Sequence, residues 1–158
     1  MSRPAVEIRP VEPGDIEWLG PRLRLADLVE MHATGYDDPI QAIRLSVDNS
    51  VFARVLVIND ELVAIGGCVK HPLSTQLSPI GVPWVVGTPL LIDHPRVLQR
   101  EGRRYIAAML ERYPQLVNVV HAANTHAVGW LRHMGFTLSP PAPWGPRGAL
   151  FHTFQMRA

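Results

Sequence analysis

The stretch of residues 116–138 constrains the fold of this 158-residue chain more than any other. It opens with an apolar run, Leu116 and three valines, which has the composition of a strand buried on both faces. Asn124 follows at the position of a helix N-cap, and apolar residues then recur at helical spacing. Gly135 is well placed to end that helix with a positive φ, before a further strand that starts at Phe136. The segment therefore predicts a strand, a short capped helix and a second strand.

Length and composition predict one soluble globular domain, residues 1–158, which buries roughly 70% of its unfolded surface. Apolar residues make up 47% of the chain, but no apolar run approaches the roughly 20 residues of a membrane span. A net charge of +1 gives no case for a nucleic-acid partner, because glutamates are scattered among the arginines. The N-terminus lacks the apolar core of a signal peptide, and the single cysteine, Cys68, fits a reducing compartment. We therefore expect the protein in a host cytoplasm or packaged in a virion.

The N-terminal half reads as a strand, two helices and a hairpin. We expect these elements over residues 6–11, 16–31, 40–47, 52–58 and 62–69. Pro21 is expected to kink or divide the first helix, and Asp38 before Pro39 to cap the second. Gly66 and Gly67, inside the last strand of this half, indicate a bulge or a closely approaching backbone.

The C-terminal half begins with a loop rich in Pro and Ser, residues 71–83, which covers a pocket or is plain surface. The elements expected after it are strands over 83–92, 116–120, 136–138 and 150–156 and helices over 95–113 and 125–134. Asp93 or His94 is expected to cap the long helix, and Pro114 to end it. The predicted order is therefore β-α-α-β-β-β-α-β-α-β-β, without a repeat or a domain boundary.

This order, together with the motif that runs from Asn124 and Ala127 to Gly135-Phe136, resembles the GCN5-related N-acetyltransferase (GNAT) superfamily over essentially the whole chain. The resemblance implies an α/β (α+β) GNAT fold, with a mixed, mostly antiparallel central sheet and helices on both faces. It also implies that one strand parts from its neighbour and leaves a V-shaped cleft for acetyl-CoA. An enzyme of this family transfers the acetyl group to an amine.

In this superfamily a segment of the form Q/R-x-x-G-x-G/A holds the pyrophosphate of the cofactor with backbone N–H groups at a helix start. The similar segment here has Gln99 and Gly102 at the first two fixed positions, and Arg104 where a small residue stands. Two interpretations remain. If the helix starts at Pro95, this segment is a solvated basic helix face. If the helix starts near Gly102, a loop cradle forms and Arg100 and Arg103 help to hold phosphates.

The full set of cofactor-binding residues implied by the resemblance, if acetyl-CoA binds, is Leu90, Leu91, Gln99, Gly102, Arg103, Arg104 and Asn124. The first two belong to the strand expected to pair with the pantetheine arm. Pro89 weakens that expectation, because proline has no N–H to donate.

The acid that commonly protonates the departing thiolate in this superfamily is a tyrosine, and counting from the motif places Leu131 at its position. The adjacent Trp130 cannot donate a proton at a useful pKa. Tyr105 and Tyr113 are alternatives only if folding brings them near, and a role in the core or on a helix surface is the other interpretation.

Two residues are candidates for the catalytic base. Glu61 lies in a hairpin turn, where a solvated side chain is the simpler interpretation, and His71 follows a central strand, where a plain loop histidine is the alternative. The seven histidines do not form the compact pairs of a zinc site, since His126 and His133 are seven residues apart. We therefore predict no metal site. Cys68 is interpreted as a small buried apolar residue.

Within the superfamily, residues 84–136 resemble the internal virion proteins of short-tailed bacteriophages, small GNAT-like proteins with an eroded catalytic signature. Leu131, Pro89 and Arg104 fit that erosion. The first hypothesis is therefore a virion-associated or assembly component that contacts phage structural proteins. The alternative is a functioning acetyl-CoA-dependent N-acetyltransferase that needs no dedicated acid.

Overall fold

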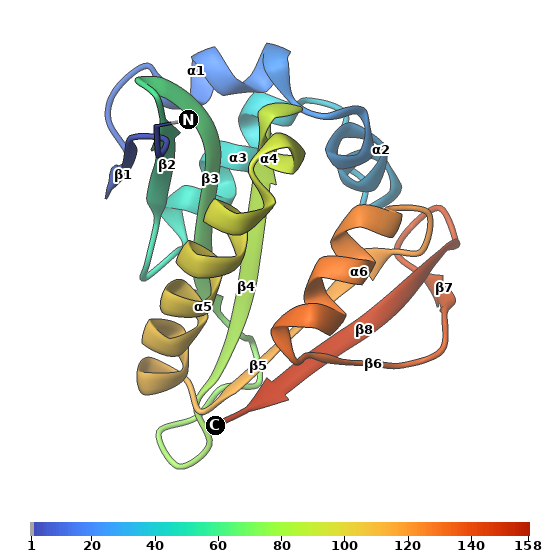
Figure 1. Ribbon diagram of the computed structural model, residues 1–158. Helices are drawn as coiled ribbons and strands as arrows, with labels where there is room; N and C mark the ends of the chain where they lie inside the picture. Colours follow the sequence, from blue (N-terminus) through green and yellow to red (C-terminus); the bar gives the residue numbers. More distant parts are fainter. Residues whose placement is uncertain (1) are drawn as a thin grey trace.

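The computed structural model describes residues 2–158 and is shown in Figure 1. The strands are β1 (Val6–Pro10), β2 (Arg54–Ile58), β3 (Glu61–Lys70), β4 (Ile80–Gly87), β5 (Gln115–His121), β6 (Thr137–Leu138), β7 (Ala142–Trp144) and β8 (Ala149–Arg157). The helices are α1 (Asp15–Leu19), the 3-10 turn η1 (Gly20–Arg22), α2 (Leu25–Ala33), α3 (Pro39–Asp48), α4 (Leu90–Asp93), α5 (Pro95–Arg112) and α6 (Thr125–Met134).

The strands form one eight-stranded sheet in the order β1-β2-β3-β4-β5-β8-β6, with β7 paired to β8. Every pair is antiparallel except β4 with β5, which is parallel. The mixed, mostly antiparallel sheet expected from the sequence is therefore confirmed.

Helices cover both faces of this sheet (Figure 1). On one face, α1, α2 and α3 pack on β2, β3 and β4 around Leu19, Ile43 and Ile65, which are all buried. On the other face, α4 and the start of α5 pack on β2 and β3, while the rest of α5 and α6 enclose a second core around Leu116 and Leu131. The two layers of helices leave β4 and β5 in the middle of the molecule.

Several local predictions are confirmed. Pro21 lies in η1, which separates α1 from α2. Asp38 caps α3, because its carboxylate accepts from the N–H groups of Ile40 and Gln41. Gly67 lies where backbone approaches closely, since a Cβ atom there would stand 2.7 Å from the carbonyl oxygen of Phe52.

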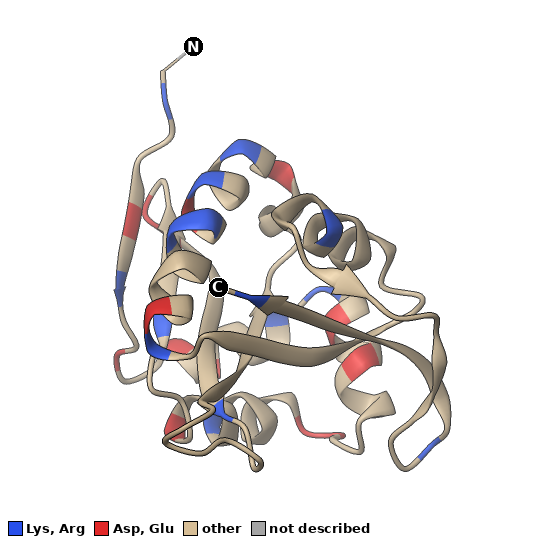
Figure 2. Cartoon of the chain, turned by 90° about the horizontal axis from the view of Figure 1, so that it is seen from below, with Lys and Arg blue, Asp and Glu red and all other residues tan. Residues whose placement is uncertain are grey.

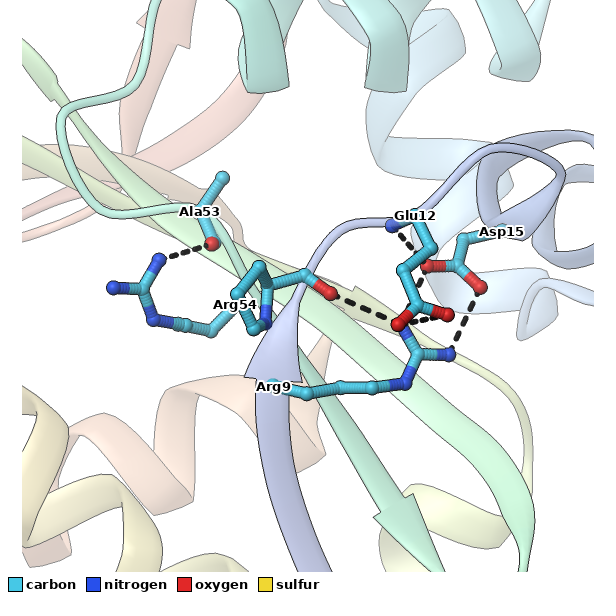
Figure 3. A network of polar contacts seen from close by, with 6 residues as sticks. Arg9, Glu12, Asp15, Ala53 and Arg54 are labelled. Carbon is cyan, nitrogen blue, oxygen red and sulfur yellow. Dashed lines mark hydrogen bonds and ion pairs between the residues drawn. The ribbon is translucent and has the colours of Figure 1, made fainter.

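Helix α1 starts without a side-chain cap. Gly14 is the N-cap, with a φ of 93°, and the Asp15 carboxylate pairs instead with Arg9 of the edge strand β1. The two Arg9–Asp15 hydrogen bonds are 2.8 and 3.0 Å long, and the N–H of Glu12 donates to the same carboxylate at 2.7 Å (Figure 3). This edge cluster of Arg9, Glu12 and Asp15 ties the first strand to the first helix.

The strand predicted over 83–92 is wrong beyond Gly87. Residues 90–93 form the short helix α4, so Leu90 and Leu91 are helical and do not extend β4. The reason is local: the Thr88 hydroxyl accepts from the N–H of Leu90, and the proline at 89 follows it as in a capped helix start. Leu91 packs into the core beside Val97 of α5.

Candidate active site

The strands β4 and β5 are paired only at their first residues. Ile80 lies opposite Gln115 and Gly81 opposite Leu116, and beyond these two positions the strands part. The Asn118 side chain spans the start of the gap: its amide nitrogen donates to the Pro83 carbonyl at 2.8 Å, and its oxygen accepts from Val119 N–H at 2.7 Å. The V-shaped opening expected between these strands is therefore present.

In an antiparallel ladder, successive residues turn their backbone N–H and C=O groups toward opposite neighbouring strands. This alternation shows which backbone groups of β4 face the gap. The N–H of Thr88 bonds to β3 at Val63, so every second residue before it also bonds to β3. The intervening residues, Pro83, Val85 and Gly87, turn their backbone groups toward β5. Asn118 takes the Pro83 carbonyl, and α2 takes both groups of Gly87. The N–H and C=O of Val85 are left facing the gap.

Helix α2 closes the wide end of the gap. The Asp27 carboxylate accepts from the N–H of Gly87 at 2.9 Å, at the end of β4. One helical turn later, the Glu30 carboxylate accepts from the N–H of His121 at 2.6 Å, at the end of β5. The two carboxylates lie on one face of α2, since they are three residues apart. Each therefore bonds to a different strand across the opening.

Arg24 and Asn124 complete this group. The Arg24 guanidinium donates to the Asn124 side-chain oxygen at 3.1 Å and lies 3.9 Å from the Asp27 carboxylate. Asn124 stands at the N-cap position of α6, as expected, but its side chain makes no capping bond and is only 4% exposed. Its role as a cap is therefore a wrong prediction, because Arg24 binds the oxygen that a cap needs. We call Arg24, Asp27, Glu30 and Asn124 the cleft cluster.

Burial controls the protonation of the two acids. Loss of water around Glu30 raises its pKa from 4.5 to about 7, opposed by the His121 N–H and the Asn124 side chain. Burial also raises the pKa of Asp27, opposed by the Gly87 N–H and by Arg24. Glu30 thus exchanges its proton near neutral pH, which is the property of an efficient general base.

A pocket of about 290 Å³ lies beside the cleft cluster, between the starts of α2 and α6 and the short helix α4. Its lining consists of Arg24, Leu25, Ala26, Pro89, Ile92, Ala123, Asn124, Thr125 and His126. The first intrahelical bond of α6 runs from Val128 to Asn124, so the N–H groups of His126 and Ala127 have no partner within the helix. Such a helix start favours a phosphate or a carbonyl oxygen.

The segment of residues 99–104 does not form a loop cradle. α5 starts at Pro95, so Gln99 and Gly102 lie inside the helix, where backbone N–H groups bond to preceding carbonyls. A Cβ atom at Gly102 would stand 2.6 Å from Cζ2 of Trp130, so this glycine allows α5 and α6 to pack together. Arg103 and Arg104 are exposed on the basic outer face of α5, visible in Figure 2. The interpretation of a helix start near Gly102 is therefore wrong.

The two base candidates lie away from the cleft cluster. Glu61 is exposed at the first position of β3, in the hairpin with β2. His71 follows β3 at the end of the sheet where β4 and β5 are paired, and its Nδ1 accepts from the N–H of Leu73. The structure therefore does not bring them together, and the acid that faces the gap is Glu30.

The tyrosines and Leu131 have structural roles. Leu131, at the position of the expected acid, is 7% exposed within the core of α5 and α6. The Tyr105 hydroxyl donates to backbone carbonyls, and burial raises its pKa well above the ordinary value. Tyr113 is buried against Cys68, whose pKa burial raises to about 11. Neither the Tyr105 hydroxyl nor the Cys68 thiol therefore exchanges its proton near neutral pH.

Arg24, Asp27 and Glu30 are the members of the cleft cluster that sequence reasoning missed. A signal was present, because Asp27 and Glu30 stand among the apolar residues 25–31 of this helix. An acid on the buried face of an amphipathic helix needs a polar partner. The partners are distant in sequence, which hides their identity.

Within residues 2–158, no group of three or more His, Cys, Asp and Glu side chains is arranged to hold a metal ion. No helix within residues 2–158 is both long and apolar enough to span a membrane.

No protein-family model matches the sequence, and no curated protein matches it. Solved structures with the same fold include an aminoglycoside N(6')acetyltransferase from Legionella pneumophila, which has a TM-score of 0.72 and 12% identity over 99% of this chain and 94% of that one. A spermidine N-acetyltransferase from Vibrio cholerae, in complex with CoA and spermine, has a TM-score of 0.69 and 13% identity over 96% and 95%. Naa50 from Arabidopsis thaliana, in complex with a bisubstrate analogue, has a TM-score of 0.64 and 11% identity over 97% and 99%. The chain therefore has the fold of GNAT acetyltransferases.

Proposed function

We propose, starting from this shared fold, that the chain is an acetyl-CoA-dependent N-acetyltransferase that acts on an amine. The observation that carries the proposal is the parting of β4 and β5 with Glu30 at the opening, its pKa raised to about 7. Structures of this fold that hold CoA with spermine, or a CoA bisubstrate analogue, give it further support.

The chain offers suitable groups for the cofactor, although not at the segment 99–104. The N–H and C=O of Val85 face the gap and suit the amide groups of a pantetheine arm. The pocket beside α4 and the free N–H groups at the start of α6 suit the more polar part of the cofactor. Asn124 lines the same pocket, so it remains a proposed cofactor contact.

Bound acetyl-CoA supplies an acetyl group as a thioester, and an amine nitrogen forms the new C–N bond while the C–S bond breaks. Glu30 takes the proton that the nitrogen loses, because its carboxylate lies at the gap and is mostly ionised above pH 7. The His121 N–H and Asn124 hold that carboxylate in place. Leu131 occupies the position of the usual acid, so the departing thiolate would take its proton from solvent.

Calorimetric titration with acetyl-CoA tests the cofactor site, with Val85→Pro as the main variant. This change removes the β4 N–H that faces the gap and is not bonded to α2, and β4 already holds Pro83 in the same orientation. We expect micromolar binding to the wild-type protein, a Kd at least tenfold higher for Val85→Pro, and little change for Val85→Ala, which keeps the N–H. Equal binding by the two variants would contradict the proposed site, provided that both melt like the wild type.

A second candidate function is a virion-associated or assembly component of a bacteriophage, acting through contacts with phage structural proteins. Its support is indirect: the helical turn at Thr88-Pro89 ends the strand that was expected to pair with the pantetheine arm. Leu131 also fits this candidate, because a buried leucine at the position of the usual acid cannot donate a proton. We expect this candidate to hold if acetyl-CoA shows no binding at millimolar concentration and mass spectrometry finds the chain in purified particles. Micromolar binding with transfer to an amine would exclude a purely structural role.

A further inference from the structure

A second pocket, of about 170 Å³, lies on the face of the sheet covered by α1, α2 and α3. Its lining consists of Met31, Thr34, Tyr36, Ala42, Ile43, Leu45, Ser46, Trp84 and Val86. None of these side chains carries a formal charge. Tyr36 and Leu45 are 41% and 47% exposed, so the rim of the pocket is apolar and open to solvent.

Three polar side chains in the wall, Thr34, Ser46 and Trp84, already have partners. The Thr34 hydroxyl donates to the Met31 carbonyl at 2.8 Å, and the Ser46 hydroxyl donates to the Ala42 carbonyl at 3.0 Å. The Trp84 indole N–H donates to the hydroxyl of Ser50 at 2.8 Å, which fixes the ring as one side of the pocket. An occupant therefore meets mainly carbon atoms and an aromatic ring, and a polar occupant would find no free donor among these three groups.

The pocket and the gap between β4 and β5 share strand β4. Trp84 and Val86 flank Val85 on β4, and their side chains lie on the face of the sheet that carries α2. On α2, Met31 of the pocket directly follows Glu30 of the cleft cluster. The gap and the pocket are therefore bounded by the same two elements, α2 and β4.

The volume limits what that group is. Ligand pockets that hold a whole small molecule usually measure roughly 300–1,000 Å³, so 170 Å³ takes only part of one. An apolar cavity of about 150 Å³ is known to take one benzene molecule. The size therefore fits a single aromatic ring or a branched aliphatic side chain.

We propose that this pocket selects the amine acceptor, which is a primary amine carrying one aromatic or branched apolar group. This inference rests on the proposed acetyl transfer, since the pocket is assigned to the acceptor of that reaction. Two kinds of molecule carry a primary amine next to an apolar group: small arylalkylamines, and peptides whose first residue is apolar.

Acetyl-transfer rates with a series of acceptors test the proposal. We expect kcat/KM to rise at least tenfold from ethylamine to isopentylamine and phenethylamine, because only the larger amines fill the pocket. Equal kcat/KM for the three amines would overturn it. The dipeptides Phe-Gly and Gly-Gly, compared with the free amines, distinguish a peptide N-terminus from a small amine as the natural source.

Two variants change the pocket without touching Glu30 or Val85. Ala42→Leu partly fills it, and we expect the preference for phenethylamine over ethylamine to fall at least fivefold. Leu45→Ala at the exposed rim enlarges it, and we expect the preference to move toward larger rings such as that of tryptamine. An unchanged preference in Leu45→Ala, with Ala42→Leu either unchanged or unfolded, would contradict the assignment.

A binding readout separates this proposal from the proposed function. In ¹⁵N-labelled protein, the indole N–H resonance of Trp84, assigned with Trp84→Phe, should shift on addition of phenethylamine and stay in place with ethylamine. If phenethylamine shifts the resonance but acetyl-CoA does not bind, the pocket stands and the proposed acetyl transfer fails. If acetyl-CoA binds and reacts but no amine shifts the resonance, the pocket assignment fails alone.

Discussion

Each of two clusters in this molecule combines one arginine with nearby carboxylates, but the carboxylate pKa is lowered in one cluster and raised in the other. In the edge cluster, the hydrogen bonds from Arg9 lower the pKa of Asp15 below its ordinary value (Figure 3). In the cleft cluster, burial raises the pKa of both Asp27 and Glu30, and Arg24 compensates only in part. The same residue types therefore give a stable ion pair in one place and a titrating acid in the other.

Geometry explains the difference. Arg9 meets Asp15 with two parallel N–H bonds of 2.8 and 3.0 Å, an arrangement that strongly favours the ionised carboxylate. Arg24 gives its hydrogen bond to Asn124 and lies 3.9 Å from Asp27, so its charge is less effective there. Desolvation then dominates the pKa of the cleft acids. The edge cluster and the cleft cluster thus contain the same residue types and differ in how the arginine is placed relative to the carboxylates.

The largest expected effect comes from Glu30→Gln. The amide oxygen still accepts from the His121 N–H, so the fold is kept, but the general base is lost. We expect kcat/KM for acetyl transfer to fall roughly 10²–10⁴-fold, measured by release of the CoA thiol. Asp15→Asn is the matched control in the edge cluster and should leave kcat/KM unchanged. The ratio of wild-type to Glu30→Gln rates should rise with pH and level off above about 7. A ratio that stays flat with pH would contradict the role of Glu30.

A large effect on stability, without one on catalysis, is expected from Arg9→Met. The substitution leaves the Asp15 carboxylate without its charged donor, so we expect a loss of roughly 1.5–3 kcal/mol in the free energy of unfolding. Urea denaturation measures it. Arg54→Met is the control, because the exposed Arg54 donates only to the carbonyl of the neighbouring Ala53, and such surface changes stay within about 0.5 kcal/mol. Equal losses in the two variants would show that the edge cluster contributes no special stability.

The two clusters should also give opposite slopes of stability against pH. Glu30 has a folded pKa raised from 4.5 to about 7, so its contribution is fully present below pH 4.5 and is lost as the pH rises to about 7. Asp15 has a lowered folded pKa, so its contribution is present above its ordinary pKa and is lost at more acid pH. We expect Glu30→Gln to flatten the first slope and Asp15→Asn the second, in urea denaturation from pH 3 to 8. If stability still falls between pH 4.5 and about 7 in Glu30→Gln as in the wild type, groups other than Glu30 cause that fall.

The smallest effect is expected from Asp27→Asn. The asparagine oxygen replaces the carboxylate as acceptor for the Gly87 N–H, and the desolvated charge disappears. We therefore expect the free energy of unfolding to change by less than about 1 kcal/mol. The fall in stability between pH 4.5 and about 7, which Glu30 causes, should remain. A loss above about 3 kcal/mol, the cost of breaking a buried ion pair, would mean that the Asp27 charge is needed by Arg24.

Much of the fold could be predicted because its signals are local. Asp38-Pro39 starts α3 and Gly135 ends α6 with a φ of 103°, both by interactions within a few residues. The same kind of signal was overlooked at Thr88-Pro89, where a capped helix start was present in the sequence but the apolar run after it was interpreted as strand. Gly102 shows the opposite error, since a glycine suited to a phosphate cradle is also suited to packing against Trp130.

The sequence by itself determined the order of most strands and helices and the ends of most of them, because spacing, caps and turns act over a few residues. It did not predict α4 or β7. The parting of the two central strands was implied by the family resemblance. Only the tertiary structure decided the site. The bonds that define it join residues 60, 91 and 100 positions apart: Gly87 with Asp27, His121 with Glu30, and Arg24 with Asn124. A pKa depends on the water and the donors that surround a group, and folding brings these donors from distant parts of the chain. Asp27 and Glu30 therefore became recognisable as site residues only when α2 was placed across the open end of β4 and β5.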